Sequence, residues 1–166
     1  MKTLTLIAIS LILFQACQSE SQDTPYTDFS IYLTKDSMVK SVLDINSVVI
    51  DSLLFKYEDM VSYDSLKHRL ELKSRTDTLF YNHGLDGRGF IAVLDGDIKV
   101  YCGIFFSPVH SSTNPNITIT LPMDNATTNH SLEILENYHD SSVNKGYAKI
   151  NDKRIIDLFK KDNKLK

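Results

Sequence analysis

Asp64 and His68 are the two side chains whose types and spacing best suit acid–base chemistry. A carboxylate and an imidazole four residues apart meet on one turn of a helix, and such a pair could activate water in a hydrolase. The stretch Lys67-His68-Arg69, however, has the character of an entry into a strand, which would separate the two side chains. We therefore expect Asp64 and His68 to shape a turn through a local hydrogen bond, with catalysis as the alternative.

Two further segments contain nucleophiles, and neither has the surroundings that activate one. His110-Ser111-Ser112 lies in a polar segment without glycine, whereas a nucleophile elbow needs glycines at fixed flanking positions. Cys102 lies in an apolar, strand-like run, whereas a reactive cysteine needs a positive environment that favours the thiolate. We expect the serines to belong to a loop and Cys102 to be a small core residue.

Arg88 and Tyr63 are candidate binding residues. Arg88 lies in the glycine-rich segment 84–89 and is a candidate anion contact, although a phosphate-binding loop leads into a helix and this segment leads into a strand. Tyr63 lies within an acidic stretch that capping and a helix dipole explain without catalysis; its members are Glu58, Asp59 and Asp64. None of the five histidines has a zinc-binding spacing, so we expect no metal site and no cofactor.

Near the N-terminus, Cys17 follows an apolar run. Lys2 supplies a positive charge, residues 4–14 are mostly apolar, and the small residue Ala16 directly precedes the cysteine. The run is about half of the roughly 20 apolar residues that a membrane-spanning helix needs. The pattern therefore predicts a secretion signal and not a membrane span.

The segment Leu13-Phe14-Gln15-Ala16-Cys17 resembles the lipobox of bacterial lipoproteins. It departs from that pattern where Phe14 replaces the usual leucine and Gln15 replaces a smaller residue. The resemblance implies that residues 1–16 are a signal peptide, that Cys17 carries lipid chains, and that the chain is anchored in a bacterial envelope, with the outer membrane favoured over the inner. The alternatives are that residues 1–14 are an ordinary cleaved secretion signal or a buried first strand. Residues 17–27 are polar and predict a flexible tether.

The length of the chain predicts one domain, and its charge limits the classes of partner that it is expected to bind. The chain has 166 residues and a formal charge of −3, and residues 28–166 are enough for a single core. A mildly acidic balance argues against nucleic acid, which needs clustered basic residues. The expected partners are the membrane, through the lipid anchor, and an envelope protein or glycan.

The pattern of apolar residues predicts an α+β domain. Strands are expected at 29–33, 47–51, 69–73, 90–94, 98–106 and 117–121. Helical segments are expected at 57–61, at 76–83 ending at Gly84, at 131–138, and after a cap at Asp152. Asp95-Gly96 between two apolar runs indicates a central hairpin over 90–106. The expected fold is a small, mostly antiparallel sheet with packed helices, including one at the C-terminus.

Several segments resemble known families. Residues 57–64, 68–72, 89–96 and 152–156 are similar to a group of small secreted bacterial lipoproteins whose function is not established. Residues 57–120 also resemble the periplasmic head subdomain of the SecD translocase subunit. That likeness implies an α+β architecture and not translocation, because function does not follow from fold alone.

Four Asp-Ser/Thr-aliphatic triplets resemble the O-glycosylation sites of exported Bacteroides-type proteins. They are Asp36-Ser37-Met38, Asp51-Ser52-Leu53, Asp64-Ser65-Leu66 and Asp77-Thr78-Leu79. The resemblance implies surface glycosylation at one or two of them.

These observations lead to one expected function and two alternatives. The leading interpretation is a membrane-anchored envelope lipoprotein that acts as a non-enzymatic accessory or binding module. The first alternative is a small envelope hydrolase using Asp64 and His68 near the segment 84–89. The second is a partner of an export machine.

Overall fold

One sheet with eight described strands forms the body of the domain. The computed structural model describes residues 26–35, 45–82, 84–107, 117–121, 130–136 and 150–166. The strands are β1 (Phe29–Thr34), β2 (Ile50–Phe55), β3 (Met60–Asp64), β4 (Arg69–Leu72), β5 (Gly89–Leu94), β6 (Ile98–Phe105), β7 (Ile117–Thr120) and β8 (Ser131–Leu135). Their order across the sheet is β2-β1-β5-β6-β7-β8-β4-β3. Neighbouring strands are antiparallel except β6 and β7, which run parallel.

Helices are fewer than expected. The described residues contain two α-helices, α2 (Thr76–Asn82) and α3 (Lys153–Lys161), and two short 3₁₀ turns, η1 (Ile45–Ser47) and η2 (Tyr57–Asp59). The fold is therefore mostly β, and α+β describes it only coarsely. The central hairpin, the mostly antiparallel sheet and the C-terminal helix are confirmed.

The hairpin of β5 and β6 lies at the centre of the sheet, as predicted. Asp95 has a φ of 48° and Gly96 a φ of 82°, and the N–H of Asp97 donates to the carbonyl of Leu94 over 3.2 Å. Positive φ at both central positions matches the twist of the flanking strands, and glycine adopts it at little cost. Every residue of β5 is buried, as its continuous apolar run predicts.

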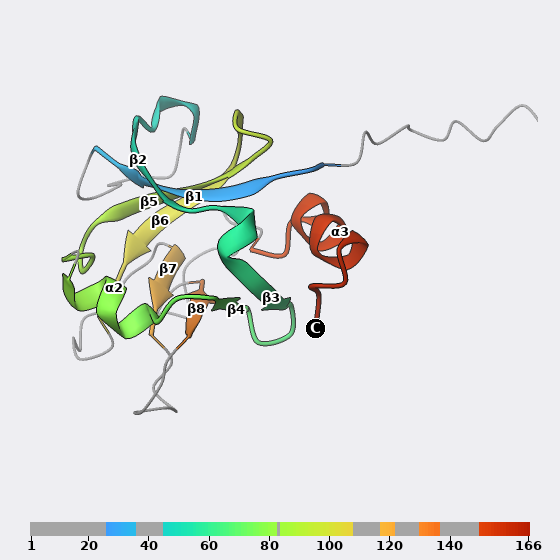
Figure 1. Ribbon diagram of the computed structural model, residues 1–166. Helices are drawn as coiled ribbons and strands as arrows, with labels where there is room; N and C mark the ends of the chain where they lie inside the picture. Colours follow the sequence, from blue (N-terminus) through green and yellow to red (C-terminus); the bar gives the residue numbers. More distant parts are fainter. Residues whose placement is uncertain (1–25, 36–44, 83, 108–116, 122–129, 137–149) are drawn as a thin grey trace, which may run out of the picture.

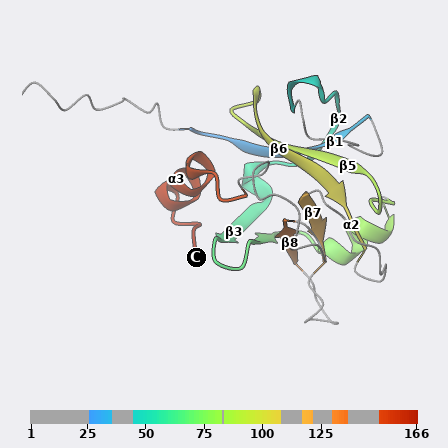
Figure 2. The same cartoon turned by 180° about the vertical axis from the view of Figure 1, so that it is seen from behind.

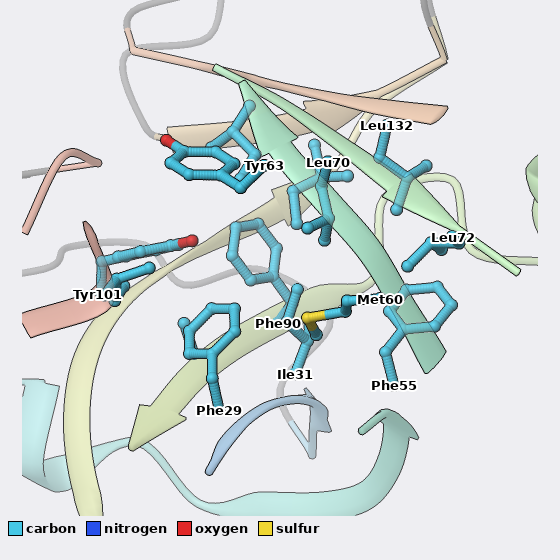
Figure 3. Close-up of a cluster of buried hydrophobic side chains, with 14 of the residues drawn as sticks. Phe29, Ile31, Phe55, Met60, Tyr63, Leu70, Leu72, Phe90, Tyr101 and Leu132 are labelled. Atoms are coloured by element: carbon cyan, nitrogen blue, oxygen red, sulfur yellow. The ribbon is translucent and has the colours of Figure 1, made fainter. Parts of the chain in front are cut away.

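The sheet is bent around its core. In Figures 1 and 2, β1, β5 and β6 form one half and β7, β8, β4 and β3 the other, with α2 and α3 at opposite ends. Figure 3 shows side chains from the two halves facing each other, among them Phe29, Phe90, Tyr63, Leu70 and Leu132. One continuous set of buried apolar side chains therefore holds both halves together.

The helix α3 follows from local sequence signals. Asp152 caps it, because its side chain accepts a hydrogen bond from the N–H of Arg154 at 2.9 Å. The apolar stripe of the helix is buried and consists of Ile155, Leu158 and Phe159. Asn163, with a φ of 56°, ends the helix in the left-handed conformation typical of such positions.

The chain after α3 covers the edge of β3. The N–H of Tyr63 donates to the carbonyl of Lys164 at 2.9 Å, and the N–H of Lys166 donates to the carbonyl of Tyr63 at 2.8 Å. The ammonium of Lys164 also lies 3.9 Å from the ring centroid of Tyr57, a favourable cation–π contact. These bonds satisfy backbone groups that an edge strand would otherwise offer to another chain.

A second apolar cluster lies on the outer face of the hairpin. Ile91, Val93 and Cys102 are fully buried there. The segment around η1 packs on them, and the ammonium of Lys99 donates to the carbonyls of Asn46 and Val48 at 2.9 and 2.8 Å. The hairpin is thus covered on both faces, as expected for strands that are apolar throughout.

Three predictions about elements need correction. Residues 131–138 were predicted to be a helix, but Ser131–Leu135 form strand β8, whose Leu132 and Ile134 alternate into the core. The strand predicted at 47–51 begins at Ile50 and continues to Phe55. The predicted helical turn at 57–61 ends at Asp59, and Met60–Asp64 form β3. In each case pairing within the sheet overrides the local preference: β8 pairs with β4 and β7, β2 pairs with β1, and β3 pairs with β4.

Candidate functional site

Asp64 and His68 lie at the two ends of the turn that joins β3 to β4. The carboxylate oxygen Oδ1 of Asp64 accepts hydrogen bonds from the N–H groups of Leu66 and Lys67, each at 3.0 Å. His68 has a positive φ of 50°, and its carbonyl accepts a hydrogen bond from the N–H of Ile134 at 2.8 Å. Within the described part of the chain, Nδ1 of His68 is buried without a hydrogen-bond partner.

The bonds at Asp64 also shift its titration. The N–H of Lys67 is the largest cause that holds the pKa of the Asp64 carboxyl below its ordinary value, because a hydrogen bond to the charged form favours that form. A general base works best with a pKa near the operating pH, so this shift makes Asp64 a weaker base. Its contacts are those of a residue that shapes a turn.

The outer face of β3, β4 and β8 carries a network of ion pairs. Arg69 and Glu133 are directly opposite in the register of β4 and β8 and approach to 3.1 Å. Glu71 accepts from the hydroxyl of Ser62 at 2.8 Å and from the ammonium of Lys166 at 2.7 Å. The second contact links Lys166, which follows α3, to Glu71 in β4.

The Glu71 contacts predict a pH dependence of stability. The hydrogen bond from Lys166 is the largest cause that lowers the pKa of Glu71 in the folded protein. The stabilising contribution of the Glu71 carboxylate to the unfolding free energy is therefore fully present above the ordinary glutamate pKa of about 4.3. It is lost as the pH falls through the folded-state pKa of Glu71. Urea unfolding across this range is expected to show a shallower acid decline for Glu71→Gln than for the parent chain.

The substitution Lys166→Gln, which replaces the lysine that donates to Glu71, supplies the control for this pH experiment. It removes the ammonium and leaves the carboxylate, so it should flatten the same acid decline in part. The double variant should add little to Glu71→Gln, because the two residues share one contact. An unchanged acid decline in Glu71→Gln would rule out this carboxylate as a source of the pH dependence.

Tyr63 is a core residue in this structure. Its side chain is 2% exposed, and its ring lies 5.6 Å from that of Phe159. The hydroxyl donates to Oδ1 of Asn151 at 3.0 Å, and Asn151 in turn donates to the carbonyl of Ser65 at 3.1 Å. Tyr63 thus connects the core to the chain before α3, and burial raises the pKa of its hydroxyl.

Arg88 lies in the glycine-rich connection and faces β2. Its Nη2 atom is 3.4 Å from Oδ2 of Asp51, and both side chains are partly exposed. The N–H of Gly87 donates to the carbonyl of Phe105, and the N–H of Phe105 donates to the carbonyl of Arg88, each at 2.8 Å. Residues 87 and 88 therefore extend the pairing of β5 with β6. An anion that binds Arg88 would compete with Asp51 for its guanidinium group.

Cys102 is the small core residue that the sequence predicts. Its side chain is fully buried on the outer face of the hairpin, and burial raises the pKa of its thiol to about 11. Little thiolate is present near neutral pH, so this thiol is a poor nucleophile.

Some of the predicted lipidation, nucleophile and glycosylation residues lie outside the part of the chain that the structure describes. Cys17 and the segment His110-Ser111-Ser112 lie outside them, as does the triplet beginning at Asp36. Of the remaining glycosylation candidates, Ser52 and Thr78 are exposed and Ser65 is half-buried.

The residues that the structure describes contain neither a cluster of metal ligands nor a helix that could span a membrane. Within that part of the chain, no group of three or more His, Cys, Asp or Glu side chains could hold a metal ion. Neither of its helices has the length and apolar composition that crossing a bilayer requires.

Sequence reasoning missed the second role of Asp95. Its Oδ1 atom accepts from the N–H groups of Thr27 and Asp28 at 2.8 and 2.9 Å, which fixes the place where the chain enters β1. The Asp95-Gly96 motif indicated the turn, but these partners are 68 and 67 positions away in the sequence. A local motif cannot indicate such distant partners.

Comparisons of the chain with protein-family models, with curated proteins and with solved structures found no match.

Proposed function

We propose that this chain is an envelope lipoprotein, anchored through Cys17 to a bacterial membrane, whose domain acts as a non-enzymatic accessory or binding module. The anchor follows from the lipobox-like segment at residues 13–17, and the outer membrane is the favoured location. One structural observation supports the non-enzymatic part. The carboxylate of Asp64, the best catalytic candidate, accepts two backbone N–H groups of its own turn. An envelope protein or glycan is the proposed partner of the domain.

Replacing the anchoring cysteine tests the proposal. Cys17→Ser is expected to move the protein from the membrane fraction to the soluble fraction of the cell, because lipid chains on one residue supply most of the membrane affinity. Cys102→Ala is the matched control, since it removes the other thiol and should leave fractionation unchanged. Membrane association of Cys17→Ser equal to that of the parent chain would contradict the anchor.

The hydrolase alternative predicts a different behaviour at Asp64. As a turn residue, Asp64→Ala should lower the unfolding free energy measured by urea denaturation, because two backbone N–H groups of the turn lose their acceptor. Asp64→Asn should stay close to the parent chain, because an amide oxygen accepts the same bonds. Hydrolysis of envelope glycans or esters that Asp64→Asn abolishes without loss of stability would favour the enzyme instead.

The export-machine alternative is tested by crosslinking in intact membranes followed by identification of partners. Recovery of an export component would support this role, and recovery of other envelope proteins would support the leading proposal.

A further inference from the structure

The C-terminal segment concentrates positive charge in an otherwise acidic chain. Residues 150–166 carry six basic and three acidic side chains, whereas the rest of the chain carries 12 basic and 18 acidic ones. On α3, Lys153, Lys160 and Lys161 are exposed. Their spacing of seven and eight residues places them on one side of the helix, which we call the basic face.

The opposite side of α3 is fixed in the core, so the basic face has a defined direction. Leu158 and Phe159 are buried at 2% and 0% exposure. Some of the positive charge is already balanced, because Lys153 forms an ion pair with Asp157 and Arg154 forms one with Asp152. Lys160 and Lys161 are the other exposed lysines of the helix. The N–H of Thr27 is the largest cause that lowers the pKa of the Asp95 carboxyl, and Lys161 lies close enough to contribute.

The described chain begins beside this face (Figure 1). The ammonium of Lys161 lies 3.4 Å from the carbonyl of Tyr26, and Asp95 holds the next two residues through hydrogen bonds to their N–H groups. Nine peptide steps separate Cys17 from Tyr26, and they can span at most about 30 Å, roughly the diameter of a small domain. An anchor at Cys17 therefore keeps Tyr26 within about 30 Å of the bilayer.

We infer that the basic face of α3 rests on an anionic lipid surface when the chain is anchored, and that it orients the domain. This inference rests on the proposed anchor and adds the side from which the membrane approaches. A lysine close to an anionic leaflet strengthens attraction by about a factor of five. Lys160 and Lys161 together therefore favour the oriented state roughly 25-fold.

Lysine footprinting of the lipidated full chain on vesicles tests the orientation. Amine-reactive labelling is compared by mass spectrometry between vesicles of phosphatidylcholine alone and vesicles that also contain phosphatidylglycerol. Labelling of Lys153, Lys160 and Lys161 should be several-fold slower on the anionic vesicles. Lys35 and Lys73 are exposed and lie outside α3, at the far end of β1 and after β4, and their labelling should not change. High salt should remove the protection, because exposed charges are screened over about 3 Å at 1 M.

Charge-matched variants complete the test. Lys160→Gln/Lys161→Gln should abolish the protection of Lys153, whereas Lys35→Gln/Lys73→Gln should preserve it. Equal labelling of the basic face on both kinds of vesicle would overturn the inference, as would protection that survives in Lys160→Gln/Lys161→Gln.

Flotation of the same samples separates this inference from the anchor. If the parent chain floats with vesicles and the basic face is not protected, the orientation is wrong and the anchor stands. If Cys17→Ser, expressed in cells, fractionates with membranes as the parent does, the anchor itself is wrong.

Discussion

Gly103→Ala is expected to destabilise the domain by about 3 kcal/mol, at the upper end of overpacking changes. A Cβ atom at Gly103 would lie 2.1 Å from the carbonyl oxygen of Ile117 and 2.9 Å from Cε1 of Phe90. The first neighbour is backbone of β7, paired with Gly103 in the parallel β6–β7 register, so it cannot move without separating the strands. Because this pair joins the two halves of the bent sheet, the strain falls on the whole core.

Urea denaturation measures this loss, and Gly87→Ala is the matched control. Gly87 has a φ of 75° but no heavy atom within 4 Å of an added Cβ. Its substitution should therefore cost about 1 kcal/mol, from backbone conformation alone. If Gly103→Ala costs no more than Gly87→Ala, the close approach of β6 and β7 is wrong.

Phe159→Ala is expected to lower the unfolding free energy by about 4 kcal/mol, as for other buried phenylalanines. The side chain is fully buried, and its ring contacts those of Tyr57, Tyr63 and Phe29 at centroid distances of 5.1, 5.6 and 6.0 Å. These partners come from η2, β3 and β1, so one ring holds α3 against both halves of the sheet. Truncation leaves a cavity that several separate elements would have to close.

Two variants calibrate the Phe159 measurement in the same urea experiment. Phe159→Leu retains much of the volume and should cost less than about 1.5 kcal/mol. Lys160→Ala lies on the exposed side of the same helix and should stay within about 0.5 kcal/mol of the parent. A loss in Phe159→Ala no larger than in Lys160→Ala would show that α3 is not part of the cooperative core.

Local elements were predictable where one short segment contains its own signals. The hairpin needed only the Asp95-Gly96 turn between two apolar runs, and α3 needed only the Asp152 cap and an apolar stripe. Strand β8 was mistaken for a helix because its five residues are short enough to suit either structure. Its place between β7 and β4 decides the outcome, because both neighbours supply backbone hydrogen bonds.

The candidate site was predictable only in part. The expected local hydrogen bond that shapes the turn is made by the Asp64 carboxylate, which binds N–H groups two and three residues ahead of it. The His68 ring does not share this role, because its Nδ1 atom has no partner among the described residues. The burial of Tyr63 and the fastening of Glu71 by Lys166 involve partners distant in sequence. No short pattern contains that information.

The sequence by itself determined the hairpin, the capped C-terminal helix and the burial of Cys102, because periodicity and turn chemistry act over a few residues. Tertiary structure alone decided the strand order, the bend that encloses the core, and the position of the basic face beside the entry to β1. These features depend on pairing between segments far apart in the chain. Such contacts stabilise the fold only after the intervening chain has closed, so no short segment of the sequence indicates them.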